Sequence, residues 1–196
     1  MYYKLTFNPY AIVAQFEAEM ANYTGSGYAV AVDSCTNALF LCCKYLQVKE
    51  VTIPAHTYLS VPQSILHAGG RVNFEELQWE GLYQLKPYPI YDSALRLTSR
   101  MYIRQSLMCL SFHYKKHLPI GKGGMILTDD EEAAKWFKRM RYEGRAEKNY
   151  WEDSIEQFGY NMYMTPSEAA TGLSLMQNLR MHNPDLAEEN GYRDLR

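Results

Sequence analysis

Apolar residues recur along the chain at two spacings, one typical of helices and one typical of short buried strands. Near the start, Ile12, Phe16 and Met20 repeat every four residues after an Asn-Pro pair that ends at Pro9. An Asn-Pro pair favours a helix start, and Gly25 stands where such a helix would stop. The pattern therefore predicts an amphipathic helix between Pro9 and Gly25.

Short β-rich runs then alternate with helical stretches. Residues 28–32 form such a run and lead into a helical stretch over residues 36–47, and a further strand is expected at residues 51–53. Other strands are expected at residues 71–74, 88–91, 107–112 and 125–128. Alternation of this kind favours a mostly parallel sheet flanked by helices, so the expected fold class is α/β.

Two later helices have recognisable starts. Asp130 is expected to open a helix that continues to residue 142. The four residues from Thr165 to Glu168 form a capping box with proline at the first helical position, which predicts a helix to about Leu179. An Asn-Pro pair ending at Pro184 predicts one more helix near the end of the sequence.

Composition narrows the class of protein. With 196 residues, 47% of them hydrophobic, and a net charge of -2, the chain suits one buried core and gives no reason to expect nucleic acid as a partner. Its four cysteines form no C-x-x-C pair and are expected to be reduced core thiols. Neither a signal peptide nor a membrane span is evident, so no membrane partner and a cytoplasmic location are expected.

A glycine-rich loop carries the most reactive candidate residue, Lys116. Ser111 lies five positions before the lysine, and the loop ends at Gly123-Gly124. A lysine between a buried strand and such a turn can be partly desolvated, which makes its amine a nucleophile suited to forming a Schiff base. The alternative is a solvated surface lysine, which is the commoner situation for this residue type.

Two other positions carry groups that suit a site around a reactive lysine. The turn over residues 33–37 joins a strand to a helix, and free N–H groups at a helix start together with the hydroxyls of Ser34 and Thr36 suit a phosphate group. Simple capping is the alternative there. Asp92 ends an apolar run, where a parallel strand would deliver a carboxylate to the active edge of the sheet. The alternative is a turn-forming aspartate before Ser93.

Five blocks of sequence together resemble the sugar aminotransferases of the DegT and StrS group, which are pyridoxal 5'-phosphate (PLP) enzymes of fold type I. The blocks occur in the order of the family and lie between about Phe16 and Leu179. They are YTGSGYAVAVDSCTNAL (23–39), VTIPAHTYLS (51–60), PIYDSA (89–94), SFHYKKHLPIGKGG (111–124) and GYNMYMTPSEAATGL (159–173).

The resemblance implies a role for each matching residue. Lys116 would bind PLP covalently and then act as the acid and base of the reaction. Asp92 would pair with the pyridine nitrogen and keep it protonated, so that the ring accepts electrons. Tyr58 would lie against the cofactor ring. The residues that would hold the phosphate group are Cys35, Thr36 and Ser111.

The family also places an asparagine across a dimer interface, next to the cofactor phosphate of the partner subunit. Asn161 matches it, so a homodimer is expected. Three positions depart from the family pattern: Cys35 replaces a glycine, Leu95 replaces a glutamine or histidine that contacts the phenolic oxygen of PLP, and Tyr163 replaces an arginine.

Two pieces of the family's chain have no counterpart here. Between Gly70 and Asp92 only a short bridge stands in place of at least one strand and helix, and after Leu179 little of the small C-terminal domain is present. The resemblance therefore implies a reduced fold type I large domain over residues 1–179. It also implies a C-terminal helix over residues 180–196 as the remnant of the small domain.

The expected activity is PLP-dependent transfer of an amino group from an amino acid, glutamate or glutamine, to a nucleotide-linked keto sugar. Its partners would be those two substrates and a second copy of the chain. Two alternatives stay open at this point. One is a non-catalytic PLP-binding or assembly module derived from the family. The other is a dehydratase of the same family, which the retained Lys116 disfavours because those members carry histidine there.

Overall fold

A computed structural model describes residues 8–148, 150–155, 157–188 and 191–196. The helices are α1 (Ala11–Thr24), α2 (Cys35–Tyr45), α3 (Ser60–His67), α4 (Glu131–Arg141) and α5 (Pro166–Met176), with a 3-10 turn at Tyr150–Glu152. The strands are β1 (Tyr28–Val32), β2 (Glu50–Pro54), β3 (Arg71–Glu75), β4 (Tyr83–Gln84), β5 (Ile90–Asp92), β6 (Leu107–Ser111) and β7 (Gly124–Thr128).

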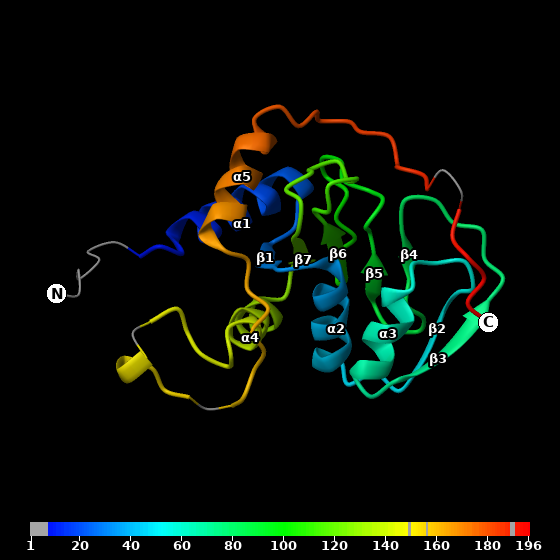
Figure 1. Cartoon of the computed structure of the whole chain (residues 1–196), viewed down its shortest axis with the longest axis horizontal. Helices are drawn as coiled ribbons and strands as arrows, with labels where there is room; N and C mark the ends of the chain where they lie inside the picture. The colour runs from blue at the N-terminus through cyan, green and yellow to red at the C-terminus, as the bar shows by residue number, and fades with distance from the viewer. Residues whose placement is uncertain (1–7, 149, 156, 189–190) are drawn as a thin grey trace.

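The sheet lies between two helical layers, as the α/β prediction requires (Figure 1). In β1, Val30 and Val32 pack against residues of α2, α3 and α4, whereas Ala29 and Ala31 pack against residues of α1 and α5. Successive strand residues point to opposite faces, so both faces of β1 are apolar and buried. The pattern of short apolar runs in the sequence reflects this burial on both faces.

Parallel pairing is less extensive than the alternation of helices and strands predicted. The main sheet has the order β1-β7-β6-β5-β4, in which β5 and β6 are parallel and the other neighbours are antiparallel. The separate pair of β2 and β3 is parallel. Residues 112–123 join β6 to β7 without a helix, and residues 85–89 join β4 to β5 by a tight turn. A connection that lacks a crossover helix favours antiparallel pairing of the two strands it joins.

The short connection between β3 and β5 supplies a strand that the sequence patterns did not reveal. Strand β4 pairs with β5, and the chain just after it bonds to β2. The N–H of Thr52 donates to the carbonyl of Lys86 at 2.8 Å, and the N–H of Lys86 donates to the carbonyl of Thr52 at 3.0 Å. These two hydrogen bonds join the two sheets next to the start of β5.

Local signals correctly predicted most helix ends. Gly25 follows α1 with a φ of 80°, and Asp130 caps α4 by accepting hydrogen bonds from two backbone N–H groups. Thr165 and Glu168 form the expected capping box at the start of α5. Each signal involves residues only a few positions apart, which is why the sequence alone was sufficient to locate it.

A buried ion pair joins both helical layers to β1. Glu17 of α1 accepts hydrogen bonds from the guanidinium of Arg141, at the end of α4, and from the N–H of Ala31 at 2.9 Å. Arg141 also donates to Glu147 at 2.9 Å. Burial disfavours the charged guanidinium, but the two carboxylates outweigh it and raise the pKa of Arg141.

The helix expected over residues 180–196 is not present among residues 179–188 and 191–196, which lie in an extended path (Figure 1). Several of their polar groups bond to the chain after β5. The side chain of Asn183 donates to the carbonyl of Leu97 at 2.8 Å, and the N–H of Leu186 donates to the carbonyl of Leu95 at 2.9 Å. Figure 1 shows this C-terminal segment arching from α5 over one end of the sheet to the side of β3.

Candidate functional site

A pocket of about 550 Å³ collects most of the residues that the sequence singled out. It lies where the start of α2, the end of β5 and the loop after β6 meet. Six of the seven predicted site residues line it: Cys35, Thr36, Tyr58, Asp92, Ser111 and Lys116. These residues lie up to 81 positions apart in the sequence, so their convergence was not contained in any local pattern.

Asp92 is the buried acid of the pocket, with 6% of its surface exposed. Its Oδ1 accepts the N–H of Ala94 at 3.0 Å, and its Oδ2 accepts the hydroxyl of Tyr83 at 3.0 Å. Burial raises the pKa of Asp92, while both hydrogen bonds and the positive charge of Lys116 act in the opposite direction. The carboxylate is thus desolvated and held by two donors.

Lys116 lies in the loop between β6 and β7, and its side chain is only 11% exposed. Its Nζ is 3.6 Å from Oε1 of Glu188, a residue of the C-terminal segment. The backbone N–H of Lys116 donates to the carbonyl of His113 at 2.9 Å, which closes a turn. The partial burial expected for this lysine is therefore present, and the amine faces the same pocket as Asp92.

The start of α2 forms another wall of the pocket. Ser34 caps the helix by accepting the N–H of Asn37 at 3.2 Å, so the hydroxyl of Ser34 does act as a cap. The N–H groups of Cys35 and Thr36 precede the first intrahelical hydrogen bonds, and such groups are suited to an anion. Gly124 packs directly beside them, because a Cβ on it would lie 2.5 Å from the nitrogen of Cys35. A side chain at that position would displace the helix start.

The hydroxyl groups near α2 have different neighbours. Thr36 donates to the hydroxyl of Ser60 at 2.9 Å, which connects α2 to α3. Ser111 ends β6 opposite Gly124 and lines the pocket. Both positions are compatible with the phosphate-binding role that the resemblance implies, and that role stays a prediction.

Aromatic side chains surround the pocket mouth. Tyr58 is 61% exposed, and its ring centroid lies 6.4 Å from that of Tyr192. Trp79 stacks on Tyr192 at 5.9 Å and meets Tyr83 edge-on at 4.6 Å. Sequence reasoning named Tyr58 only. The other aromatic residues come from β4, the chain before it and the C-terminal segment, which carry no motif that would have indicated a site.

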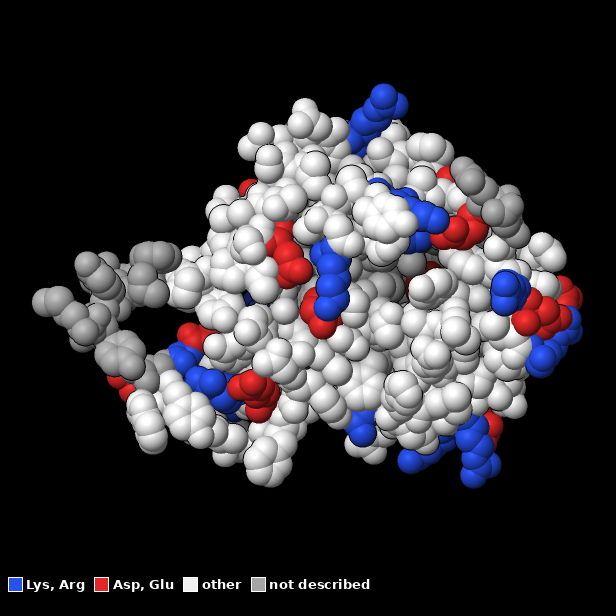
Figure 2. Space-filling view, viewed as in Figure 1, with Lys and Arg blue, Asp and Glu red and all other residues white. Residues whose placement is uncertain are grey.

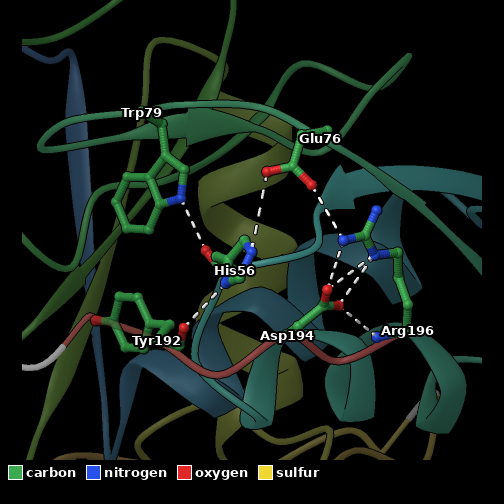
Figure 3. Close-up of polar contacts among 6 residues, drawn as sticks. All are labelled: His56, Glu76, Trp79, Tyr192, Asp194 and Arg196. Carbon is green, nitrogen blue, oxygen red and sulfur yellow. Dashed lines mark hydrogen bonds and ion pairs between the residues drawn. The ribbon is translucent and has the colours of Figure 1, made fainter.

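The C-terminal segment reaches the pocket because its last residues bind the edge near β2 (Figure 3). His56 Nδ1 lies 3.0 Å from the carbonyl oxygen of Tyr192, and the N–H of Leu195 donates to the carbonyl of Ala55 at 3.1 Å. Arg196 pairs with Glu76 at 3.1 Å and also with Asp194. These contacts place Glu188 and Tyr192 in the pocket wall, a placement that the sequence did not predict.

Asn161 lies apart from the other predicted site residues. Its side-chain amide donates to Oε1 of Glu143 at 3.0 Å, and its backbone pairs with Tyr142. It is not among the residues that line the pocket. Its expected contact with the cofactor of a partner subunit therefore stays a prediction.

Charges of both signs are intermingled on the face seen in Figure 2. Beside the pocket, Lys122 Nζ lies 3.6 Å from Oδ2 of Asp33. The described residues contain no cluster of three or more His, Cys, Asp or Glu side chains suited to a metal ion. Within the same residues, no helix combines the length and apolarity needed to cross a membrane.

Comparison with known protein families gives one match. The DegT/DnrJ/EryC1/StrS aminotransferase family model matches residues 4–88 and 103–186. The spore coat polysaccharide biosynthesis protein SpsC of Bacillus subtilis (strain 168) is 26% identical, over 85% of this chain and 57% of its own. A UDP-4-amino-4,6-dideoxy-N-acetyl-beta-L-altrosamine transaminase of Campylobacter jejuni is 24% identical, over 90% of this chain and 59% of its own.

Solved structures support the same fold. AtS13 from Actinomadura melliaura gives a TM-score of 0.74 at 20% identity, covering 86% of this chain and 60% of that one. The PLP form of Spr1654 from Streptococcus pneumoniae gives 0.71 at 20% identity, covering 86% and 59%. The expected reduced fold type I architecture is confirmed. The chain spans about three fifths of the length of these relatives.

Proposed function

Because the chain belongs to the DegT/DnrJ/EryC1/StrS aminotransferase family, we propose that its pocket binds PLP and transfers an amino group to a nucleotide-linked keto sugar. PLP is the cofactor of this family, as the sequence resemblance implied. The proposed amino donor is glutamate or glutamine. The 3-oxo-glucose-6-phosphate:glutamate aminotransferase of Bacillus subtilis, 26% identical over 92% of this chain and 50% of its own, supports glutamate as the donor.

The residues of the pocket fit PLP in their chemistry. A helix start with unpaired N–H groups suits the phosphate, and the absence of a side chain on Gly124 lets that helix start lie directly against β7. Asp92 offers a buried carboxylate to a protonated pyridine nitrogen. Lys116 offers a largely buried primary amine. Asp92 ends β5, and Lys116 lies in the loop after the neighbouring parallel strand β6; their convergence in one pocket is the observation that carries the proposal.

Each residue then has a defined task. When bound, PLP supplies an electron-accepting ring that stabilises negative charge on the substrate carbon. Asp92 holds a proton on the pyridine nitrogen through its charge, because a carboxylate favours the cationic ring. Lys116 would hold the cofactor through its amine and would move a proton at its Nζ between cofactor and substrate carbons. The aromatic residues at the mouth limit the access of water.

Covalent trapping provides the test. Borohydride should fix PLP to Lys116 in the wild type, and Lys116→Ala should abolish that fixation while Lys115→Ala retains it. Lys115 is the matched control because it is adjacent and exposed. Peptide mapping by mass spectrometry identifies the labelled lysine. Labelling of Lys115 instead, or no binding of PLP by the wild type, would refute the assignment of Lys116.

The competing function is a PLP-binding or assembly module without turnover. It is favoured by Leu95, which lines the pocket where the family has a hydrogen-bonding residue. A half-reaction separates the two functions. With excess glutamate, the enzyme should convert bound PLP to its amine form, seen as a change of the absorbance spectrum, whereas the module should leave the spectrum unchanged for hours.

A further inference from the structure

We propose that Tyr83 is a positioning residue for Asp92: its hydroxyl fixes the orientation of the carboxylate and favours the ionised form that faces the pyridine nitrogen. This role rests on the proposed function, because it acts through the contact between Asp92 and PLP. Nothing in the sequence pattern indicated it, since β4 is only two residues long and lies in the short connection before β5.

The hydroxyl of Tyr83 contacts the carboxylate oxygen of Asp92 that accepts no backbone hydrogen bond. Oδ1 of Asp92 accepts the N–H of Ala94, and Oδ2 accepts the hydroxyl of Tyr83, each at 3.0 Å. Strand pairing sets this contact, because Tyr83 is the direct partner of Asp92 in the antiparallel ladder of β4 and β5. With both oxygens held, the carboxylate has one orientation relative to the pocket.

Hydrogen bonds link Thr57, Tyr83 and Asp92 in a chain, and each hydroxyl donates toward the carboxylate. The hydroxyl of Tyr83 has one proton, and the contact with Asp92 uses it, so the hydroxyl of Thr57 at 2.5 Å must donate to the oxygen of Tyr83. Thr57, Tyr83 and Asp92 are all buried. In a buried chain each donated bond polarises the next, which strengthens the bond that reaches the carboxylate.

Several charged or titratable groups act on Asp92 from the elements packed around it. The positive charge of Lys116, in the loop after β6, favours its ionised form. Cys35 of α2, Cys109 of β6 and Tyr192 of the C-terminal segment also interact with it electrostatically. Burial raises the pKa of Asp92, and the bond from Tyr83 lowers it. Loss of that bond alone should therefore raise the pKa further.

The test uses PLP labelled with ¹⁵N at the pyridine nitrogen, whose NMR shift reports whether the ring is protonated. In wild-type protein the ring should keep its proton as the pH rises above the value at which free PLP loses it, because the ionised Asp92 stabilises the cationic ring. Tyr83→Phe keeps the aromatic ring and removes the hydroxyl. It should move this transition, the loss of the ring proton, to lower pH by about one unit, because a less firmly oriented and less ionised carboxylate stabilises the cationic ring less. It should also weaken PLP binding about tenfold, as expected for one hydrogen bond to a charged group.

Two further variants make the result specific. Tyr91→Phe is the matched control, because Tyr91 lies next to Asp92 on β5 but packs into the core on the opposite face of the sheet, and it should change neither value. Thr57→Val leaves Tyr83 in place and removes its donor. It should shift the transition in the same direction by a smaller amount, and it keeps the test available if Tyr83→Phe does not fold.

The outcomes distinguish this role from the proposed function. If wild-type protein does not bind PLP, both are wrong. If wild-type protein binds PLP with a protonated ring, and Tyr83→Phe and Thr57→Val show the same transition as Tyr91→Phe, the role of Tyr83 is wrong while the proposed function stands. A shift confined to Tyr83→Phe and Thr57→Val supports the positioning role.

Discussion

At the scale of single residues, the pocket combines groups that are costly to bury with the contacts that compensate for them. Asp92 is buried beside Lys116, and each carboxylate oxygen of Asp92 has a donor. Burial nevertheless dominates, so the pKa of Asp92 is raised. Shifts of pKa that arise from burial and nearby charges are common at functional sites.

The raised pKa gives a prediction for stability. A carboxyl group whose pKa is higher in the folded than in the unfolded state contributes most to stability below its unfolded pKa of about 3.9. That contribution is lost as the pH rises through the folded pKa. Asp92→Asn should therefore gain stability relative to the wild type as the pH increases from about 4 to 7. Urea unfolding of both cofactor-free proteins across this range measures the difference, and a constant difference would contradict the prediction.

Leu95 gives a second prediction at this scale. It lines the pocket but offers no hydrogen bond to the phenolic oxygen of PLP. Leu95→Gln should restore that bond and accelerate formation of the amine form with glutamate by about tenfold, since a tenfold rate change needs only ~1.4 kcal/mol. Stopped-flow absorbance gives the rate. Leu95→Met keeps the apolar character and should leave the rate within about twofold of the wild type. Equal rates for the wild type and Leu95→Gln would show that Leu95 does not limit the reaction.

At the scale of elements, the ion pair of Glu17 and Arg141 holds α1 and α4 on either side of β1. Both side chains are almost completely buried. Removal of Glu17 leaves the buried guanidinium with Glu147 as its remaining carboxylate partner, and breaking a buried pair typically costs about 3–5 kcal/mol. A pair of this kind therefore matters more for fixing α1 and α4 relative to each other than its net contribution to the free energy of unfolding suggests.

Glu17→Ala should consequently destabilise the protein by about 3–5 kcal/mol. Glu19→Ala, on the exposed side of the same helix, should change the stability by less than about 0.5 kcal/mol. Equilibrium denaturation in urea measures both free energies of unfolding. Similar values for the two variants would mean that Arg141 finds other partners or water when Glu17 is removed.

At the scale of the whole molecule, the pocket contains six of the seven predicted residues, and Asn161 lies outside it. The family resemblance explains this if Asn161 serves the pocket of a second copy. We therefore expect a dimer with a two-fold axis, because two-fold pairing is the commonest form for identical subunits. Size-exclusion chromatography with light scattering should give twice the mass of the chain at micromolar concentration.

Subunit mixing makes the same expectation more specific. Lys116→Ala and Asn161→Ala should each be inactive in the half-reaction when tested alone. A mixed dimer of the two variants would contain one pocket with both residues intact, so mixing should recover about a quarter of the wild-type sites. A strictly monomeric protein, or no recovery after subunit exchange, would remove Asn161 from the site.

Local sequence was sufficient for much of the fold. The capping box at Thr165, the cap at Asp130 and the glycine after α1 fall where the sequence predicted them. The strands β1 and β7 begin within one residue of the expected positions. These features depend on neighbours in the chain, through side-chain capping and through apolar runs buried on both faces. The resemblance also named Lys116 and Asp92, and both line one pocket.

Tertiary structure decided the features whose partners are distant in sequence. Strand β4 exists because it pairs with β5, and Tyr83 reaches Asp92 only through that pairing. The C-terminal segment is extended where a helix was expected, because Leu95 and other distant residues accept its hydrogen bonds. The sequence by itself therefore determined the class of fold and most element ends, and it named the candidate site residues. The walls of the pocket and the surroundings of Asp92 depended on long-range pairing, which local patterns do not encode.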